Sequence, residues 1–216
     1  MFRVFYYLIE TCNREPNTLA TGYIDDIAIL RWGSSIKETC NGLEKAMQRA
    51  MIWARKHASV FAPSKFQLTH HTRRRQVADV DRHIQIEQTI IAPSESSKYL
   101  GVTLDTALNW KQHIQNLKIK TSKSIGALAS LASPTWGVRV AELRKIYQAV
   151  VIPQMMYGCS VWSVAHEHGE GYTKQTIDSL KSLQAKAARI IGGAYKATSG
   201  PALDVELHLL PVEHQI

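Results

Sequence analysis

Cysteine is scarce in this sequence, and a long apolar run is missing. Three cysteines, Cys12, Cys40 and Cys159, occur in 216 residues, and an odd number of widely spaced thiols indicates neither a disulfide framework nor a zinc cluster. No run approaches the roughly 18 apolar residues that a membrane-spanning helix needs, so we expect no membrane partner. The N-terminus has one arginine and no small-residue cleavage site, which argues against a signal peptide. We therefore expect an intracellular protein, in the nucleus or the cytoplasm.

Acidic residues are also in the minority. The chain has 18 Asp and Glu against 26 Lys and Arg, which gives a net charge of +8 and a pI near 9.4. This balance favours a polyanionic partner, with nucleic acid ahead of an anionic membrane surface, although a soluble protein can also simply be basic. Apolar residues make up 45% of the chain, which is enough for a packed core. There is no internal repeat and no low-complexity tract.

Two adjacent acidic residues, Asp25 and Asp26, lie between two apolar runs in the stretch 21–30. The pattern predicts a strand, a tight turn that carries both carboxylates, and a second strand. A solvated turn with two Asp residues would be ordinary turn chemistry. Two carboxylates this close to a hydrophobic interior repel each other, however, and a cation offsets that repulsion. Hard divalent cations such as Mg²⁺ take oxygen ligands of this kind.

The rest of the first half predicts one long helix and several short strands. Residues 35–38 form a capping box, and the helix after it has an apolar stripe at spacings of three and four residues. We expect residues 64–72 to form a strand, with further short strands up to residue 104. Gly101 lies inside the last of these, 98–105, and a glycine there is typical of a bulge or of a close backbone approach.

From residue 110 onward the pattern is helical. One apolar stripe covers 114–132, another starts at 140 and is ended by Pro153, and a third covers 177–191 before two glycines. A final short helix is predicted after Ser199. Strands followed by helices indicate an α+β fold class, with a β-rich region at 1–105 and an all-helical region at 106–216.

Several basic and imidazole side chains leave more than one interpretation open. Three consecutive arginines, Arg73, Arg74 and Arg75, follow the predicted strand 64–72. Such a triplet on a loop could grip phosphate groups, and it is equally typical of a solvated turn. His70 and His71 are adjacent, so on a strand they would face opposite ways, which argues against a joint metal site.

The order of four motifs is more specific than any one of them. The chain contains Gly22-Tyr-Ile-Asp-Asp-Ile-Ala-Ile-Leu, then Phe61-Ala-Pro-Ser-Lys, then Tyr99-Leu-Gly-Val-Thr-Leu-Asp followed by Trp110-x-x-His, and later Tyr157-Gly-x-x-x-Trp. This set resembles the reverse transcriptases of non-LTR (LINE-like) retrotransposons, fungal ones especially. The resemblance runs nearly end to end. It implies a partial polymerase palm in residues 1–105 and a thumb-like helical region in 106–216.

The resemblance also assigns roles around the Asp pair. Asp25 would be the firm ligand and Asp26 the weaker ligand of the Mg²⁺ ions of nucleotidyl transfer. Tyr23 would pack beside the primer end. Lys65 would lie near the incoming triphosphate, and its alternative is a solvated lysine at a strand edge.

Further roles follow from the later motifs. Tyr99, Leu100 and Gly101 match the primer-grip hairpin of this family, and the helices after Trp110 would hold the duplex through its backbone. The implied partners are an RNA template, a DNA primer or RNA–DNA hybrid, and deoxynucleotides.

One part of the polymerase pattern is missing from the sequence. Polymerase palms supply a further Asp from an earlier strand, whereas residues 1–20 offer only Glu10 and Glu15, neither in a matching context. Segments for an endonuclease, an RNase H or a zinc knuckle are not apparent either. We therefore expect a truncated reading frame or a degenerate element copy, with half a metal site and little catalysis of its own, because catalysis depends on complete positioning.

Two other hypotheses remain open at the level of sequence. The first is a non-catalytic, basic nucleic-acid-binding module, which would bind in a salt-dependent but metal-independent way. The second is a metal-dependent hydrolase unrelated to polymerases. It would need further carboxylate or histidine ligands that converge on Asp25.

Overall fold

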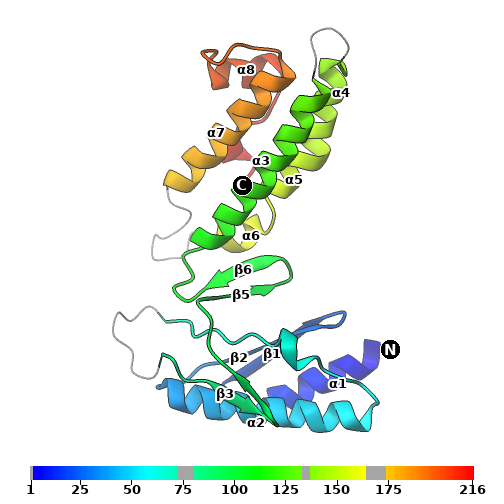
Figure 1. Ribbon diagram of the computed structural model, residues 1–216, viewed down its shortest axis with the longest axis vertical. Coiled ribbons are helices and arrows are strands. Elements are labelled where there is room, and N and C mark those ends of the chain that lie inside the picture. Colours follow the sequence, from blue (N-terminus) through cyan, green and yellow to red (C-terminus); the bar gives the residue numbers. More distant parts are fainter. Residues whose placement is uncertain (1, 73–79, 133–136, 164–173) are drawn as a thin grey trace. The chain divides into compact units, whose positions relative to one another are not determined.

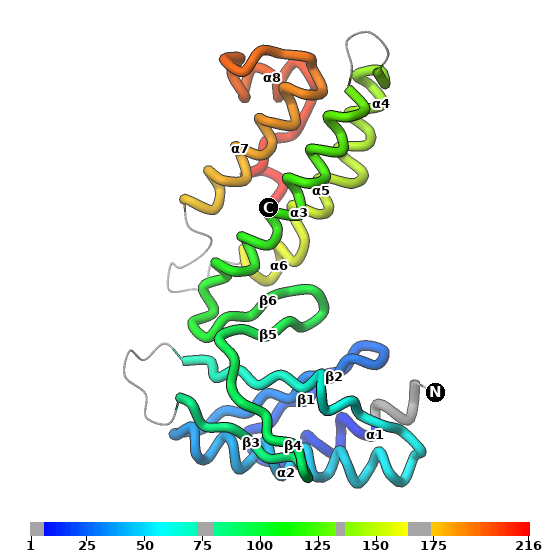
Figure 2. Tube along the Cα trace, viewed as in Figure 1, coloured from blue at the N-terminus to red at the C-terminus, as the bar shows by residue number. Residues whose placement is uncertain are grey.

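The computed structural model describes residues 2–72, 80–132, 137–163 and 174–216 of the chain. These residues divide into two compact units, Met1–Asn109 and Trp110–Ile216 (Figure 1). The described strands all belong to the first unit, and the second unit is helical (Figure 2). The two units therefore separate the β-rich half of the sequence from its helical half.

The boundary between the units falls later than residue 105, where the sequence pattern placed it. Thr106 belongs to the first unit because its N–H donates to the carbonyl of Glu95 at 3.1 Å, and its own carbonyl accepts from the N–H of Thr72 at 3.0 Å. These backbone bonds reach distant residues of the first unit. A change in hydrophobic periodicity along the sequence does not reveal them.

The first unit is built from helices and small antiparallel hairpins. Its elements are α1 (Phe2–Asn13), β1 (Thr18–Tyr23), β2 (Asp26–Arg31), α2 (Ile36–Lys56), the 3₁₀ turn η1 (Pro63–Lys65), β3 (Ile84–Ile86), β4 (Thr89–Ile91), β5 (Ser96–Tyr99) and β6 (Val102–Asp105). Each consecutive strand pair, β1–β2, β3–β4 and β5–β6, forms a two-stranded antiparallel sheet. A core of six buried residues from α1, β1 and α2 supports the first hairpin, namely Leu8, Cys12, Ala20, Ala50, Trp53 and Ala54.

The predicted strand at 64–72 is wrong. Its first residues belong to η1, and only Leu68 forms an isolated bridge, with Pro93. Proline has no N–H to donate, so a ladder cannot be extended through Pro93. The next backbone bond, from the N–H of Ser94 to the carbonyl of Leu68 at 2.8 Å, completes the contact.

The start of α2 confirms half of the predicted capping box. The side chain of Ser35 accepts the N–H of Glu38 at 3.2 Å, which satisfies one of the free donors of the first helical turn. The Glu38 carboxylate does not accept the backbone N–H of Ser35, as a complete capping box would require. It accepts instead from the N–H and the hydroxyl of Ser34, at 3.1 and 2.8 Å, and these bonds lower the pKa of Glu38.

The second unit packs its helices around two hydrophobic clusters. Its elements are α3 (Lys111–Leu131), α4 (Val140–Ile146), the π-helical turn η2 (Tyr147–Val151), α5 (Ile152–Met155), α6 (Cys159–Trp162), α7 (Lys174–Ile191), α8 (Gly200–Glu206) and the 3₁₀ turn η3 (Val212–His214). The stripe that the sequence placed on the first of these helices is confirmed. Its buried members are Ile114, Leu117, Thr121, Ile125 and Leu128.

Pro153 does not end the helix that starts at Val140, contrary to the prediction. The chain continues helically through η2 into α5, and Pro153 lies in the first turn of α5. At η2 the N–H of Ile152 donates to the carbonyl of Tyr147, five residues back, so the turn is wider than an α-turn. Pro153 lacks a backbone N–H and carries a bulky ring, and the wider π turn accommodates it within the helix.

None of the described helices is both long enough and apolar enough to cross a membrane.

We predict that Gly126→Ala stabilises the second unit. Gly126 lies in the interior of α3 and is exposed, and a Cβ built there meets no heavy atom within 4 Å. Glycine costs about 1 kcal/mol relative to alanine at such a position, so the free energy of unfolding should rise by that amount. Chemical denaturation measures the change. Gly193→Ala is the matched comparison, because Gly193 has φ +60° and alanine there should destabilise.

Candidate functional site

The Asp pair lies at the tip of the hairpin β1–β2. The last pair of the ladder is Tyr23 with Asp26, so Ile24 and Asp25 form a two-residue turn. The predicted arrangement of strand, turn and strand is confirmed, with Asp26 as the first residue of β2. Both carboxylates belong to exposed residues.

The register of the hairpin decides which way each side chain faces. Successive side chains of a strand point to opposite faces, and cross-strand partners share a face. Ala20 and its partner Ile29 belong to the buried cluster against α1 and α2, so Thr21, Tyr23 and Asp26 lie on the opposite, outer face. Tyr23 is 61% exposed, which fits this assignment.

On the inner face of the hairpin, a side chain of α1 comes close to the backbone beside the turn. A Cβ on Gly22 would lie 2.9 Å from Cδ1 of Ile9 in α1. Gly22 therefore lets the tip of the hairpin approach α1 closely.

The turn itself is strained. Ile24 has φ +56°, a region that β-branched residues rarely adopt. The Ile24 side chain is also 60% exposed, so burial does not compensate for the strain. Strained backbone of this kind is typical of functional sites, where the surrounding structure holds it in place.

We predict that Ile24→Gly raises the free energy of unfolding by about 1 kcal/mol, because glycine adopts a positive φ without a steric penalty. Ile24→Ala is the matched comparison. It removes the β-branch but keeps a Cβ, so it should recover less of this energy. Chemical denaturation distinguishes the two variants, and equal stabilities of Ile24→Gly and Ile24→Ala would contradict the prediction.

A second hairpin, β5–β6, carries the predicted primer-grip residues. Tyr99 pairs with Val102, and the turn between them consists of Leu100 and Gly101, with φ +46° and +82°. Two positive φ values define a type I′ turn, which suits the twist of a two-residue hairpin. The prediction of a continuous strand with a bulge at Gly101 is therefore wrong. The hairpin that the family resemblance implied is present.

One hydrogen bond joins the two hairpins directly. The hydroxyl of Thr21 in β1 and the phenol of Tyr99 in β5 are 3.3 Å apart, across 78 positions of sequence. Thr21 lies on the outer face of β1, two residues before Tyr23. Its position on that face was available from the sequence, but its partner was not.

The other predicted residues lie away from this tip or outside the described residues. Lys65 is exposed and ends η1, rather than lying at a strand edge. Arg73, Arg74 and Arg75 lie outside the described residues, so the structure does not place them. Within the part of the chain that the structure describes, no group of three or more His, Cys, Asp or Glu residues could hold a metal ion.

The donor set at the hairpin tip fits Mg²⁺ in one specific way. Mg²⁺ is usually bound through one or two carboxylates together with substrate phosphates and water. Asp25 and Asp26 supply two exposed carboxylates, which is the protein share of such a site. Phosphate oxygens of a nucleotide would complete it.

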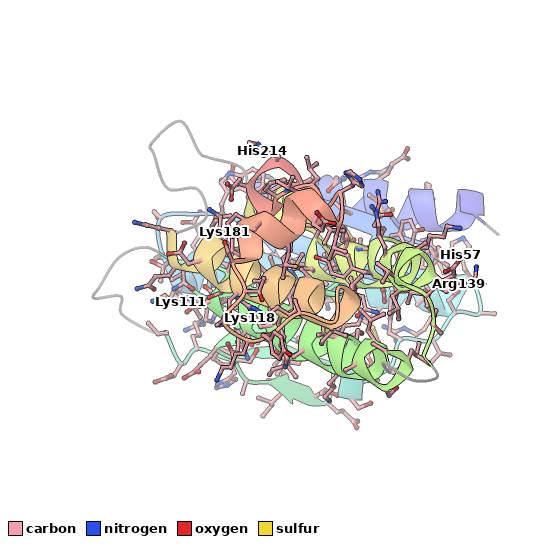
Figure 3. All side chains as sticks on the ribbon, turned by 90° about the horizontal axis from the view of Figure 1, so that it is seen from above. His57, Lys111, Lys118, Arg139, Lys181 and His214 are labelled. Atoms are coloured by element: carbon pink, nitrogen blue, oxygen red, sulfur yellow. The ribbon has the colours of Figure 1, made fainter. Side chains whose placement is uncertain are left out.

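The second unit presents basic side chains. The helix α3 has four lysines, Lys111, Lys118, Lys120 and Lys123, and no acidic residue. Lys118 donates to the hydroxyl of Ser179 in α7 at 3.3 Å, and Lys181 forms an ion pair with Glu213 at 2.6 Å, which raises the pKa of Lys181. Figure 3 labels Lys111, Lys118 and Lys181 on these helices.

Two motifs of the second unit meet at one backbone carbonyl, which sequence reasoning missed. The carbonyl of Tyr157 accepts from Nε2 of His113 at 3.2 Å and from Nε1 of Trp162 at 2.9 Å. His113 is 1% exposed, and Trp162 is 2% exposed. The spacing of Trp110-x-x-His and of Tyr157-Gly-x-x-x-Trp was visible in the sequence, but not that the two segments contact each other.

Most of the chain is similar in sequence to known retrotransposon proteins. The chain is 27% identical over 198 residues to the probable RNA-directed DNA polymerase from transposon BS of Drosophila melanogaster, covering 92% of this chain and 21% of the relative. It is 26% identical over 181 residues to the RNA-directed DNA polymerase from the mobile element jockey of the same species, covering 83% of this chain and 19% of the relative. Its homologues are retrotransposon RNA-directed DNA polymerases.

A third relative extends the match to another element. It is the retrovirus-related Pol polyprotein from the type-1 retrotransposable element R1 of Nasonia vitripennis, 26% identical over 205 residues, covering 91% of this chain and 58% of the relative. These relatives are insect proteins and do not support the fungal assignment. The chain spans about a fifth of the length of the first two relatives. No family model and no solved structure matches it.

Proposed function

We propose that this chain supplies the carboxylate hairpin and a duplex-holding helical unit of a non-LTR retrotransposon RNA-directed DNA polymerase. The observation that carries the proposal is the hairpin tip, where Asp25 lies in the turn and Asp26 begins β2, both exposed, with Tyr23 on the same face as Asp26. The similarity to retrotransposon polymerases over most of the chain supports it. Because the chain spans about a fifth of these relatives, the reaction of the whole protein is itself part of the proposal.

In this proposal the hairpin works in phosphoryl transfer of the two-metal type. Asp25 and Asp26 would hold Mg²⁺, which would supply neutralisation of the negative charge that develops on the reacting phosphate. Asp25, in the turn, is the firm ligand, and Asp26, fixed by its pairing with Tyr23, is the weaker one.

Three further sets of residues are assigned to contacts with the nucleotide and the primer. Tyr23, exposed beside the carboxylates, offers a ring face to the primer end. Lys65, exposed at the end of η1, is assigned to the triphosphate. For the arginines at 73–75 a phosphate contact remains a prediction from the sequence.

The second unit is proposed to hold the duplex as a thumb. Four lysines without an acidic residue make α3 suited to phosphate backbones, which proteins contact in a largely sequence-independent, salt-dependent way. This same observation favours a second candidate function, a nucleic-acid-binding module that works without the carboxylates. The proposed partners are an RNA template, a DNA primer and deoxynucleotides, inside the cell.

The test compares the wild-type chain with Asp25→Asn in two assays. The first measures binding of Mn²⁺ together with a deoxynucleoside triphosphate, and the second measures Mg²⁺-dependent primer extension on an RNA template. Nucleotide-dependent metal binding that disappears in Asp25→Asn supports the polymerase site, and extension that disappears with it establishes the full reaction. Salt-dependent nucleic-acid binding that is the same in both proteins, without any metal dependence, would favour the binding module instead.

A further inference from the structure

Tyr99 lies next to one strained hairpin turn of the first unit and contacts the strand that leads into another. The turn next to Tyr99 holds Leu100 at φ +46°, and the turn after Tyr23 holds Ile24 at φ +56°. Both are apolar residues in a backbone region that favours glycine, and both are at least a third exposed, at 37% and 60%. Strain at two solvent-exposed tips needs a surrounding structure that holds both turns in place.

The Thr21–Tyr99 hydrogen bond supplies such a constraint. Its 3.3 Å contact is between side chains that are both part-buried, so water competes less with it than at a fully exposed site. Thr21 lies on the outer face of β1, the face that carries Tyr23 and Asp26. A bond to Thr21 therefore anchors the second hairpin to the face on which the carboxylate of Asp26 lies.

The backbone of β5–β6 is otherwise tied to a different part of the unit. The N–H of Lys98 donates to Oε1 of Gln67 at 2.9 Å, and Nδ1 of His71 contacts the carbonyl of Asp105 at 3.1 Å. The first contact is made by the residue directly before Tyr99, and the second by the last residue of β6. The Tyr99 phenol acts next to the turn itself, on the side of the first hairpin.

We propose that Tyr99 is a positioning residue, which ties the β5–β6 hairpin to the outer face of β1, the face that carries Asp26, through its hydroxyl bond to Thr21. This inference rests on the proposed function, because the element positioned is the carboxylate site. Loss of the hydroxyl bond leaves both hairpins folded but lets their tips move apart.

The first experiment uses Mn²⁺ as a paramagnetic probe on the isotopically labelled full chain. In the wild type, Mn²⁺ with a deoxynucleoside triphosphate should broaden the amide signals of Asp25 and Asp26 and also those of Leu100 and Gly101, since broadening falls steeply with distance. In Tyr99→Phe and in Thr21→Val, broadening at the Asp turn should persist and broadening at the Leu100–Gly101 turn should fall by at least half. Unchanged broadening at both turns in these variants would overturn the proposal.

Matched controls separate positioning from general loss of structure. Tyr195→Phe removes a phenol that is 88% exposed in the second unit and should leave both turns as in the wild type. A variant that merely unfolds would lose broadening at the Asp turn as well.

The second experiment keeps the inference testable if the metal site fails. Amide hydrogen exchange at Val102 should become several-fold faster in Tyr99→Phe and in Thr21→Val, because each loses one hydrogen bond. The double variant should be no faster than the single variants, since both remove the same bond. Multiplicative effects would show that Thr21 and Tyr99 are independent and would reject the inference. An absence of Mn²⁺ broadening in the wild type would instead reject the metal site alone.

Discussion

Asp25→Asn should lower the affinity of the chain for Mn²⁺ with a deoxynucleoside triphosphate by roughly 100-fold, or about 2.7 kcal/mol. Asparagine keeps the shape of the side chain and the preference for turns, so the hairpin remains. What is lost is one negative oxygen ligand of a hard divalent cation. Asp26→Asn should have a smaller effect, about tenfold, because Asp26 is assigned the weaker ligand role.

The measurement is a Mn²⁺ titration followed by water-proton relaxation, with and without nucleotide. Asp178→Asn is the control, because Asp178 is an exposed carboxylate on α7 in the other unit. The control variant should bind as the wild type does. Equal affinities of the wild type and Asp25→Asn would show that the hairpin tip is a solvated turn, which was the alternative left open by the sequence.

Removal of the His113 imidazole should cost the second unit about 2–3 kcal/mol in free energy of unfolding. His113 is 1% exposed and donates to the carbonyl of Tyr157 at 3.2 Å. His113→Ala therefore leaves both a cavity and a weakened hydrogen-bonding site. The carbonyl keeps its bond from Trp162, which keeps the loss below that of a wholly unsatisfied buried group.

The same residue predicts a pH dependence. Burial lowers the pKa of His113 below its ordinary value of 6.5, and the bond to the Tyr157 carbonyl opposes this only in part. The unfolded chain therefore binds a proton at a higher pH than the folded chain does. The contribution of neutral His113 is fully present above pH 6.5, and it is lost as the pH falls from 6.5 through the lowered pKa of the folded state.

Amide hydrogen exchange at α3 measures this effect between pH 7 and 5, after correction for the intrinsic rate. His113→Gln does not titrate, so it should flatten the pH dependence of stability. His208→Gln is the matched control, because His208 is exposed in the same unit, and it should retain the wild-type profile. A profile that is unchanged in His113→Gln would show that another group carries the pH dependence.

Much of the secondary structure was fixed by local patterns. The buried stripe of α3 and the end of α7 at Gly192 and Gly193 follow from helical periodicity and from a C-terminal glycine with positive φ. The turn around Asp25 follows from a short polar step between two apolar runs, the second of them rich in isoleucine. In each case the signal and the structure that it specifies lie within a few residues of each other.

The tertiary structure decided what depends on partners far along the chain. Residues 64–72 are kept from forming a strand because Leu68 contacts Pro93, and the helix passes Pro153 because η2 widens. The bond between Thr21 and Tyr99 spans 78 positions. The sequence by itself determined the carboxylate pair and its hairpin, since local periodicity and turn chemistry specify them. Only the tertiary structure decided which second hairpin is tied to that face, because the two partners of the bond lie on separate elements far apart in the sequence.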